Sequence, residues 1–382
     1  MTAPGGSGPA DIAITGVEVF LVRLPVKLPR KHGSGEVAGR VANVVLKLTT
    51  DSGIAGWGEA APWTVFTGSA EANAAALDVY FRPFLLGANP CRVTTLMREA
   101  EKALVGHGDA KAALETALLD ILGQVSGLPI SDLLGGRCRD EIPLSFSIAN
   151  PDFEADFELA SKLYDEGLRL FKVKTGFAEH ACDITRLERL RETLPDDAEL
   201  RVDYNQGLAP FEAITRLRDI EAFRPTFIEQ PVPGDQVEAM AAITAALDTP
   251  VMADESVFTP AQALRAVEKR IADILSIKIM KSGGMLRARE VAAIAEAGGL
   301  ACYGGDMFET GIAHLAGAQM IAATPNISLG CEFYQATYYL EQDLLAEAFP
   351  VKSGKVIVPR TPGLGIRVDE DRVRHFAEIS RG

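Results

Sequence analysis

Short apolar segments alternate with longer amphipathic stretches along the second part of the chain. Eight apolar segments are rich in β-branched and aromatic residues, as buried parallel strands are: 142–149, 170–176, 199–205, 226–231, 250–255, 274–281, 300–305 and 327–333. The stretches between them have apolar residues at helical spacing, for example 154–166, 237–247 and 286–297. Eight strand–helix repeats in about 200 residues predict an α/β fold of the TIM type, a (β/α)8 barrel rather than an open sheet.

The first part of the chain has a different pattern. Segments 14–24, 41–49 and 54–58 predict three antiparallel strands, and 76–86, 94–104 and 110–124 have the spacing of helices. The long basic loop 25–39 is expected to be a mobile flap. We therefore expect an α+β capping domain over 1–135, the barrel over 136–340, and a C-terminal segment, 341–382, that packs back on the capping domain.

Composition excludes several classes of partner. A net charge of −14 argues against nucleic acid and anionic membranes. No apolar run approaches the length of about 20 residues that spans a bilayer. The first residues do not resemble a signal peptide, and their Gly, Pro and Ser content predicts an unstructured start through Pro9. The five cysteines are dispersed without a CxxC pair, which is typical of free, buried thiols in a cytoplasmic protein.

Ionisable residues occupy six positions near the C-terminal ends of the predicted strands and interrupt their apolar pattern. They are Lys172, Lys174, Asp203, Glu229, Asp254 and Lys278. Burying such groups is costly unless they are paired or bind a metal. In a barrel of this type the C-terminal ends of the strands form the rim that carries the active site. The pattern therefore predicts a single active site to which several strands contribute charged side chains.

Three of these residues, Asp203, Glu229 and Asp254, lie on three consecutive predicted strands. Carboxylates that converge at a rim repel one another strongly where the dielectric constant is low. A hard divalent cation removes that repulsion, and ligation by oxygen alone favours Mg²⁺ or Mn²⁺ over Zn²⁺. The alternative is three separate carboxylates, each paired with a neighbouring lysine.

The lysines flank this trio along the chain. Lys172 and Lys174 share one face of the preceding strand, and Lys278 lies on the strand that follows. Positive charge from the cation and from the other lysines is expected to lower a lysine pKa towards that of a general base. Lysines on both faces of a bound carboxylate can then add or remove a proton at its α-carbon while the cation stabilises the enolate. Lys281 is out of phase with Lys278 in this strand and is expected to be structural.

Other candidates have weaker signals. Glu332, on the eighth predicted strand, can orient a lysine or bind substrate, with a salt bridge or a helix cap as the alternative. Asp306 and Glu309 follow the seventh strand, His32 lies in the flap, and Asn205 shares a face with Asp203; each can contact substrate. The remaining histidines fit no ligand spacing and are expected on the surface or in packing: His107, His180, His314 and His375.

The motifs FKVKTG, RVDYNQ, FIEQP, MADES and SIKIMKSGG, in this order, resemble the enolase superfamily in its muconate lactonizing enzyme (muconate cycloisomerase) subgroup. The resemblance extends from about Ile14 to PRTPGLGI at 359–366. It implies a modified TIM-type barrel closed by a capping domain that both chain ends form. It also implies a homo-oligomer, and Mg²⁺ (or Mn²⁺) bound by Asp203, Glu229 and Asp254.

The same resemblance implies roles for the lysines. Lys174 and Lys278 would be acid–base residues on opposite faces of the substrate, with Lys172 supporting Lys174 and contacting the substrate carboxylate. Glu332 matches the acidic residue that cycloisomerases carry on the last strand, and Asn205 would form hydrogen bonds near the cation. The loops at 25–39 and 63–69 match the capping-domain loops that select the substrate.

Several departures bear on the substrate. This chain has GGDMFETG where cycloisomerases typically have GGTMLEG, and LGCEFYQ where they have WGTELFG. It lacks the Asp-x-Asp pair of dipeptide epimerases on the eighth strand and the histidine of acid-sugar dehydratases on the seventh. We therefore expect a cycloisomerase that acts on cis,cis-muconate or a related dicarboxylate. The alternatives are a racemase, epimerase or dehydratase of an amino-acid derivative and, more distantly, a metal-free Schiff-base lyase.

Overall fold

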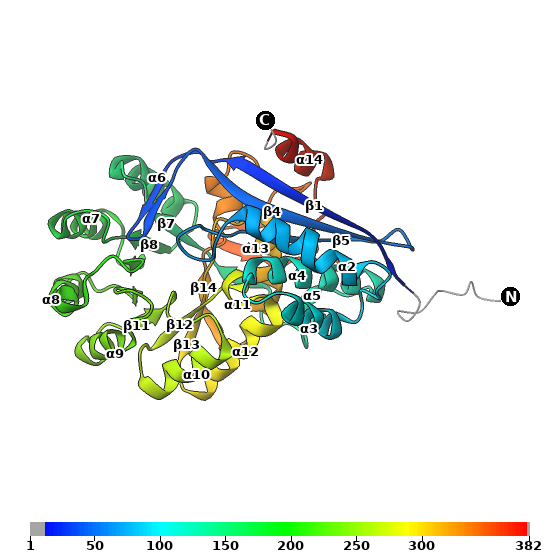
Figure 1. Cartoon of the computed structure of the whole chain (residues 1–382). Helices are drawn as coiled ribbons and strands as arrows, with labels where there is room; N and C mark the ends of the chain where they lie inside the picture. Colours follow the sequence, from blue (N-terminus) through cyan, green and yellow to red (C-terminus); the bar gives the residue numbers. More distant parts are fainter. Residues whose placement is uncertain (1–11, 380–382) are drawn as a thin grey trace.

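A computed structural model describes residues 12–379 of the chain (Figure 1). The unstructured start predicted for the first nine residues lies outside this range. An eight-stranded parallel sheet and a three-stranded antiparallel sheet form the two main parts. No helix among the described residues is long and apolar enough to cross a membrane.

The eight strands of the barrel follow one another in sequence order around the sheet. They are β7 (Ser145–Ile148), β8 (Leu170–Lys174), β9 (Glu199–Asp203), β10 (Ile228–Glu229), β11 (Val251–Ala253), β12 (Ile274–Ile277), β13 (Ala301–Gly304) and β14 (Ile327–Cys331). An isolated bridge between Leu144 and Cys331 links the two edges, so the barrel is nearly closed. The predicted barrel is confirmed, with strands shorter than the apolar segments that predicted them.

Helices follow the first seven strands and cover the outside of the barrel (Figure 1). They are α6 (Phe153–Asp165), α7 (His180–Thr193), α8 (Pro210–Glu221), α9 (Val237–Ala246), α10 (Pro260–Lys269), α12 (Met285–Ala297) and α13 (Gly311–Ala322). The strands are almost wholly buried, because the helices cover one face of the sheet and the side chains of the barrel interior cover the other.

In two of the predicted barrel strands, residues beyond the observed strand form a different element of secondary structure. Residues 142–143 belong to β6 (Glu141–Pro143), which pairs with β16 (Lys355–Ile357) and not with the barrel. β16 also pairs with β15 (Val351–Lys352). The strand predicted over 274–281 ends at Ile277 and continues as the short helix α11 (Ile279–Ser282). The alternation of side chains along a strand therefore does not extend beyond Ile277.

The capping domain consists of an antiparallel sheet and a layer of helices. The sheet has the order β1 (Ile14–Pro25), β4 (Arg40–Thr50), β5 (Ala55–Ala60), as predicted. The helices are α1 (Ala70–Ala75), α3 (Val93–Ala103), α4 (Gly108–Ser126) and α5 (Ile130–Leu133). β5 packs closely on α4, since a Cβ atom at Gly58 would lie 1.9 Å from the carbonyl oxygen of Ala113.

One predicted helix of the capping domain is irregular. The segment 76–86 forms the π-helix η1 (Ala76–Phe81) and then the short helix α2 (Arg82–Leu85). Pro83 lies in this segment and has no N–H to donate to the preceding turn, which disfavours a continuous α-helix. Val79 and Tyr80 lie in the π-helix and are 59% and 49% exposed, although both are apolar or aromatic.

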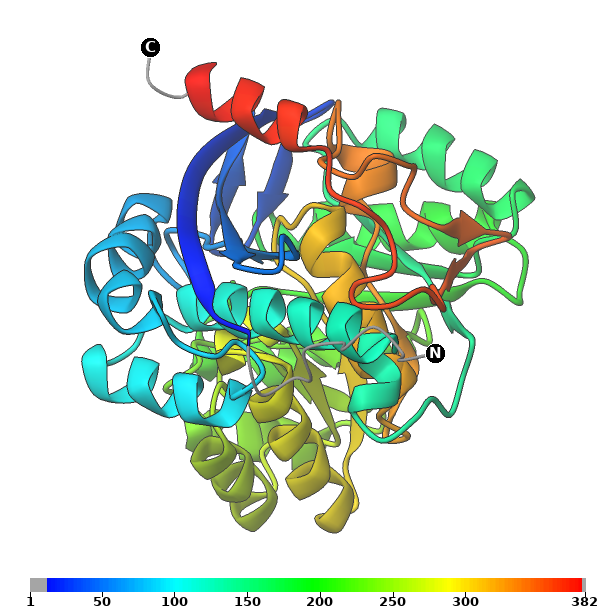
Figure 2. The same cartoon turned by 90° about the vertical axis from the view of Figure 1, so that its right-hand side faces the viewer.

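The loop 25–39 and the C-terminal segment join the two parts of the molecule. The loop folds into a hairpin of β2 (Arg30–His32) and β3 (Gly35–Val37), and the Lys31 amide donates to the carbonyl of Ala149 at 2.8 Å. The second π-helix, η2 (Gln335–Tyr339), follows the last barrel strand. The final helix α14 (Glu370–Ile379) lies along β1 (Figure 2), where Arg374 pairs with Glu18 at 2.8 Å.

The cysteines are all free, as expected, but their burial differs from the prediction. Cys302 and Cys331 lie in barrel strands and are buried. Cys138 and Cys182 are exposed, and Cys91 is half-buried. Burial of the thiols is therefore a property of the two barrel cysteines only.

Candidate active site

The register of the barrel strands brings charged residues to one rim. Lys174 is the Cα partner of Asp203, and Asp203 is the Cα partner of Glu229. Asp254 comes directly after β11, and Lys278 comes directly after β12. All five side chains are buried. The structure thus brings together the residues that sequence reasoning placed at the C-terminal ends of successive strands.

Lys172 is the centre of a network of carboxylates. Its ammonium nitrogen lies 2.7 Å from Glu229 Oε2, 3.2 Å from Asp203 Oδ2 and 2.5 Å from Glu332 Oε2. Lys174 shares the same Asp203 oxygen, at 2.5 Å, and also donates to Asn205 Oδ1 at 3.0 Å. Lys172 therefore holds three acids together and, through Asp203, is linked to Lys174.

Asp254 is the centre of a second group. One of its carboxylate oxygens lies 2.6 Å from the ammonium of Lys278, and the other lies 2.7 Å from the ammonium of Lys281. Lys281 also donates to the Asp254 carbonyl at 2.8 Å. It reaches this position because residues three apart on the helical turn of α11 lie on the same side. The strand phase that separated Lys281 from Lys278 in the sequence does not apply here.

Glu229 shows that the three carboxylates act on one another. Burial raises its pKa, and the negative charges of Asp203, Asp254 and Glu332 raise it further, against the opposing effect of Lys172. The Oε1 atom of Glu229 is buried and has no hydrogen-bond partner. The structure also shows the lysine pairs that the alternative of three separate carboxylates requires, so a shared cation site stays a prediction.

These residues fit a divalent cation. They supply three carboxylates from adjacent strands, one of which has a buried oxygen without a partner. Among the described residues, the group whose ligand atoms all lie within 4.8 Å of one another is a different one, Asp306, Glu309 and His314, and not this trio. In the trio, Lys172 contacts both Asp203 and Glu229, and Lys278 contacts Asp254.

The lysine pKa values differ from the expectation. Burial lowers the pKa of Lys278, but the carboxylates of Asp254 and Glu229 raise it by more, so that the net shift is upward. The pKa of Lys172 is raised in the same way by Glu229, Glu332 and Asp203. The lowering that we expected requires a cation to neutralise these carboxylates, since each lysine otherwise lies directly on one of them.

A cavity opens over this rim and is lined by residues from both parts of the molecule. Lys174 and Lys278 line it together, with Asn205, Glu332 and Asp306. The capping domain contributes His32 and Trp63, whose ring centroids lie 5.0 Å apart, and the His32 ring lies 5.7 Å from that of Phe308 in the barrel. Lys172 is not among the lining residues but contacts Glu332, which is, and its predicted contact with the substrate stays a prediction.

The weaker candidates fall into different places. His32 is buried in the cavity wall, where burial and the charge of Lys174 lower its pKa well below the usual value. Asp306 lines the cavity, whereas Glu309 lies behind it and accepts a hydrogen bond from the Met307 amide at 2.7 Å. Asn205 accepts from Lys174 and donates to Glu255 at 3.2 Å.

Sequence reasoning missed several residues of the site. Glu255 directly follows Asp254 and is half-buried, with its Oε2 atom enclosed, and its pKa is raised to about 8 by desolvation and by the charges of Asp254 and Asp203. The MADES motif contained it, but it was out of phase with Asp254 in the predicted strand, which in fact ends at Ala253. Tyr334, Gln335 and Ser147 also line the cavity, and no local pattern distinguishes them from packing residues.

Comparison with known proteins identifies the class. A family model described as "Enolase C-terminal domain-like" matches residues 156–372, and one described as "Mandelate racemase / muconate lactonizing enzyme, N-terminal domain" matches residues 14–135. The chain therefore belongs to the enolase superfamily, in its muconate lactonizing enzyme subgroup, and is an enzyme of that superfamily. Enzymes of this family use a divalent metal ion.

Individual relatives have two different activities. The chain is 33% identical to muconate cycloisomerase 1 of Acinetobacter baylyi, over 94% of this chain and 98% of that protein. It is 35% identical to L-Ala-D/L-Glu epimerase of Bacillus subtilis, over 92% of this chain and 95% of that protein. The chain is 50% identical in sequence to a muconate cycloisomerase from Azorhizobium caulinodans whose crystal structure is known. The match has a TM-score of 0.83 and covers 95% of this chain and 98% of that chain.

Proposed function

We propose that this enzyme adds or removes a proton at the carbon next to a carboxylate, with the help of a divalent cation, and that it acts as a muconate cycloisomerase on cis,cis-muconate or a related dicarboxylate. The observation that carries the proposal is that Lys174 and Lys278, which follow or end two different strands, line one cavity. Each is paired with a carboxylate of the candidate metal trio. The cycloisomerase relatives support the choice of substrate.

The residues of the chain can be assigned to steps of the reaction. One carboxylate of the substrate adds to the conjugated double bond at the far carbon, which closes the lactone ring. The electron pair of that double bond moves towards the second carboxylate, and an ammonium group donates a proton to the α-carbon. Lys174 is the proposed proton donor, with Lys278 on the opposite side. The lysine then takes up a proton from solvent, so the lactone contains all atoms of the dicarboxylate and one added proton, and no group is lost.

The carboxylate trio has a separate role in this proposal. A divalent cation held by Asp203, Glu229 and Asp254 would stabilise the negative charge that develops on the substrate carboxylate. Lys172 keeps Asp203 and Glu229 in place, because its ammonium contacts both. The rings of His32, Trp63 and Phe308 pack edge to face and form one wall of the cavity.

A second candidate is racemisation or epimerisation of an amino-acid derivative. It is favoured by the presence of two lysines on one cavity, since one can remove an α-proton while the other returns a proton from the opposite face. The relative from Bacillus subtilis has an epimerase activity. Lactone formation from a dicarboxylate adds one proton at the α-carbon. Racemisation exchanges the α-proton of the substrate without a net change in composition.

Both candidates can be tested in one experiment. The enzyme is incubated in D₂O with Mg²⁺ and with cis,cis-muconate, dipeptides or N-acyl amino acids, and deuterium at the α-carbon is followed by NMR. We expect deuterated lactone from muconate, and loss of turnover in Lys174→Met. Lys269→Met, which changes a half-exposed lysine on α10, is the matched control. Activity that survives chelation, together with trapping of substrate on lysine by borohydride, would reject the proposal in favour of a Schiff-base lyase.

A further inference from the structure

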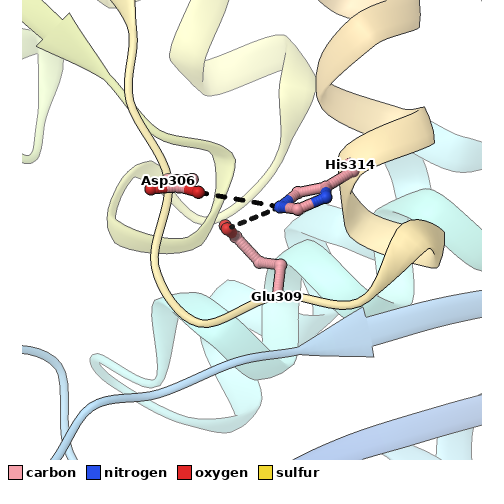
Figure 3. A group of neighbouring side chains, drawn as sticks. All are labelled: Asp306, Glu309 and His314. Atoms are coloured by element: carbon pink, nitrogen blue, oxygen red, sulfur yellow. Dashed lines mark ion pairs between the residues drawn. The ribbon is translucent and has the colours of Figure 1, made fainter. Parts of the chain in front are cut away.

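A second group of ionisable side chains lies beside the active-site cavity, after β13 and in the first turn of α13. It consists of Asp306, Glu309 and His314, which are at most 7% exposed. Figure 3 shows both carboxylates directed towards the same ring nitrogen of His314. Asp306 Oδ2 and Glu309 Oε2 each lie 3.7 Å from His314 Nε2. The three ligand atoms all lie within 4.8 Å of one another.

Among the described residues, Lys278 acts on both acids of this group only from beyond ion-pair distance. No lysine or arginine pairs with Asp306 or Glu309, whereas Asp203 and Asp254 each pair with two lysines. Asp306 Oδ2 and both ring nitrogens of His314 are buried without a hydrogen-bond partner. The separation of 3.7 Å is too long for a hydrogen bond from the imidazole to either carboxylate. Two carboxyl groups and one imidazole thus direct their ligand atoms towards one another without forming hydrogen bonds among themselves.

Burial makes this arrangement unfavourable as it stands. It raises the pKa of Glu309 to about 8, with Glu59 and Asp109 adding to the effect. It raises the pKa of Asp306 well above its usual value, with Glu332 and Glu309 adding to the effect. Burial also lowers the pKa of His314 to about 3, against the opposing effect of Gln335. The imidazole therefore does not supply the missing positive charge, and it presents a lone pair that can bind a metal.

We propose that Asp306, Glu309 and His314 bind a divalent cation of the zinc class, at a site distinct from the carboxylate trio. One nitrogen and two oxygen donors suit Zn²⁺ or Co²⁺, whereas Mg²⁺ favours oxygen alone. Bonds of about 2.0 to 2.2 Å at tetrahedral angles place two ligands about 3.4 Å apart. The observed 3.7 Å needs only a small contraction to reach this spacing.

The cation at this site orders the wall of the catalytic cavity. Asp306, Met307 and Phe308 line that cavity in succession. Glu309 is already linked to this loop through the Met307 amide. Asp306 stands where related cycloisomerases typically have threonine, so this ligand belongs to one of the departures of the chain from the cycloisomerase motif. The site acts by positioning the loop, and none of its three ligands belongs to the trio.

Co²⁺ is a suitable probe, because its visible absorption is strong in a four-coordinate site and weak in an octahedral site with oxygen ligands. The full-length protein is freed of metal and titrated with Co²⁺ as wild type, as His314→Phe and as Asp203→Asn. The phenylalanine can retain the packing of the imidazole, which stacks on Phe333 at 5.1 Å between centroids. Asp203→Asn alters the trio and leaves this site intact.

We expect the visible band in the wild type and in Asp203→Asn. In His314→Phe we expect the band to be absent and the protein to bind one equivalent of Co²⁺ less. Asp306→Asn, which preserves the shape of the side chain, should weaken the band-forming step at least tenfold and covers the case in which His314→Phe fails to fold. A band that survives both substitutions at this site, or that disappears in Asp203→Asn, would overturn the proposal. The readout does not depend on turnover, so it is independent of the proposed reaction.

Discussion

Glu59 links the capping domain to the barrel, and replacing it should destabilise the protein in a pH-dependent way. Its carboxylate, on β5, accepts hydrogen bonds from Asn43 Nδ2 at 2.7 Å, from the Thr310 amide at 2.9 Å and hydroxyl at 2.7 Å, and from the Ala313 amide at 3.1 Å. Thr310 and Ala313 lie at the start of α13, next to the loop that lines the cavity. Glutamine at position 59 would turn an amide N–H₂ group towards some of these donors.

The magnitude follows from the number of donors left without an acceptor. A hydrogen bond to a charged group contributes about 1.5 to 3 kcal/mol, and a buried donor without a partner costs about 1 to 3 kcal/mol. In Glu59→Gln one of the two carboxylate oxygens becomes an N–H₂ group, so at least one hydrogen bond is lost and at least one buried donor is left without an acceptor. We therefore expect it to lower the free energy of unfolding by about 2 to 4 kcal/mol above pH 7, where the carboxylate is ionised.

The pH dependence has a definite sign. Burial raises the pKa of Glu59 from 4.5 to about 7, and the hydrogen bonds from Thr310, Ala313 and Asn43 oppose it only in part. Between these two pKa values the folded protein retains a proton that the unfolded chain releases, so stability falls as the pH rises. At about 1.4 kcal/mol per pH unit this amounts to about 3 kcal/mol. The excess stability of the wild type over Glu59→Gln should therefore shrink from about pH 4.5 to about pH 7 and stay constant above.

Urea unfolding followed by tryptophan fluorescence measures this difference, because both tryptophans, Trp57 and Trp63, belong to the capping domain. Glu59→Asp, which retains the charge but shortens the reach, is the matched control. The reasoning is refuted if the difference between the wild type and Glu59→Gln grows as the pH rises from about 3 to 4.5 and is flat beyond. That result would mean that the four donors keep the carboxylate ionised and its pKa below the unfolded value.

Three further predictions concern the site and the packing of the capping domain. Lys278→Met should reduce turnover by about 10²- to 10⁴-fold, as expected for loss of an acid–base group, and kcat measured with the best substrate checks this. Chelation should abolish activity, and Mg²⁺ or Mn²⁺ should restore it; full activity in a dialysed, metal-free sample would contradict the assignment of the trio. Gly58→Ala should destabilise the protein by about 1 to 3 kcal/mol, because the added methyl group overlaps the backbone of α4. Gly16→Ala, whose Cβ would lie 3.4 Å from Thr49, should be nearly neutral when both variants are measured by urea unfolding.

The local pattern of the chain was sufficient to predict the barrel and the position of its charged residues. Parallel strands buried on both faces must be apolar, so each charge in a strand such as Lys174 or Asp203 stands out. The C-terminal ends of such strands meet at one rim. Strand order, together with register, then brings Asp203 next to Glu229 without any further information. This part of the site depends on periodicity and topology, and both can be read from the sequence.

Only the tertiary structure decided the remaining contacts, because they join residues with no local relation. Lys281 reaches Asp254 through a helical turn that the apolar pattern of the segment concealed. His314 meets Asp306 because the turn before α13 folds back on itself, and histidines at such spacing carry no ligand signature. Glu59 binds the start of α13 from 251 residues away along the chain. Long-range packing of the capping domain on the barrel sets such contacts, and periodicity within a segment does not encode them.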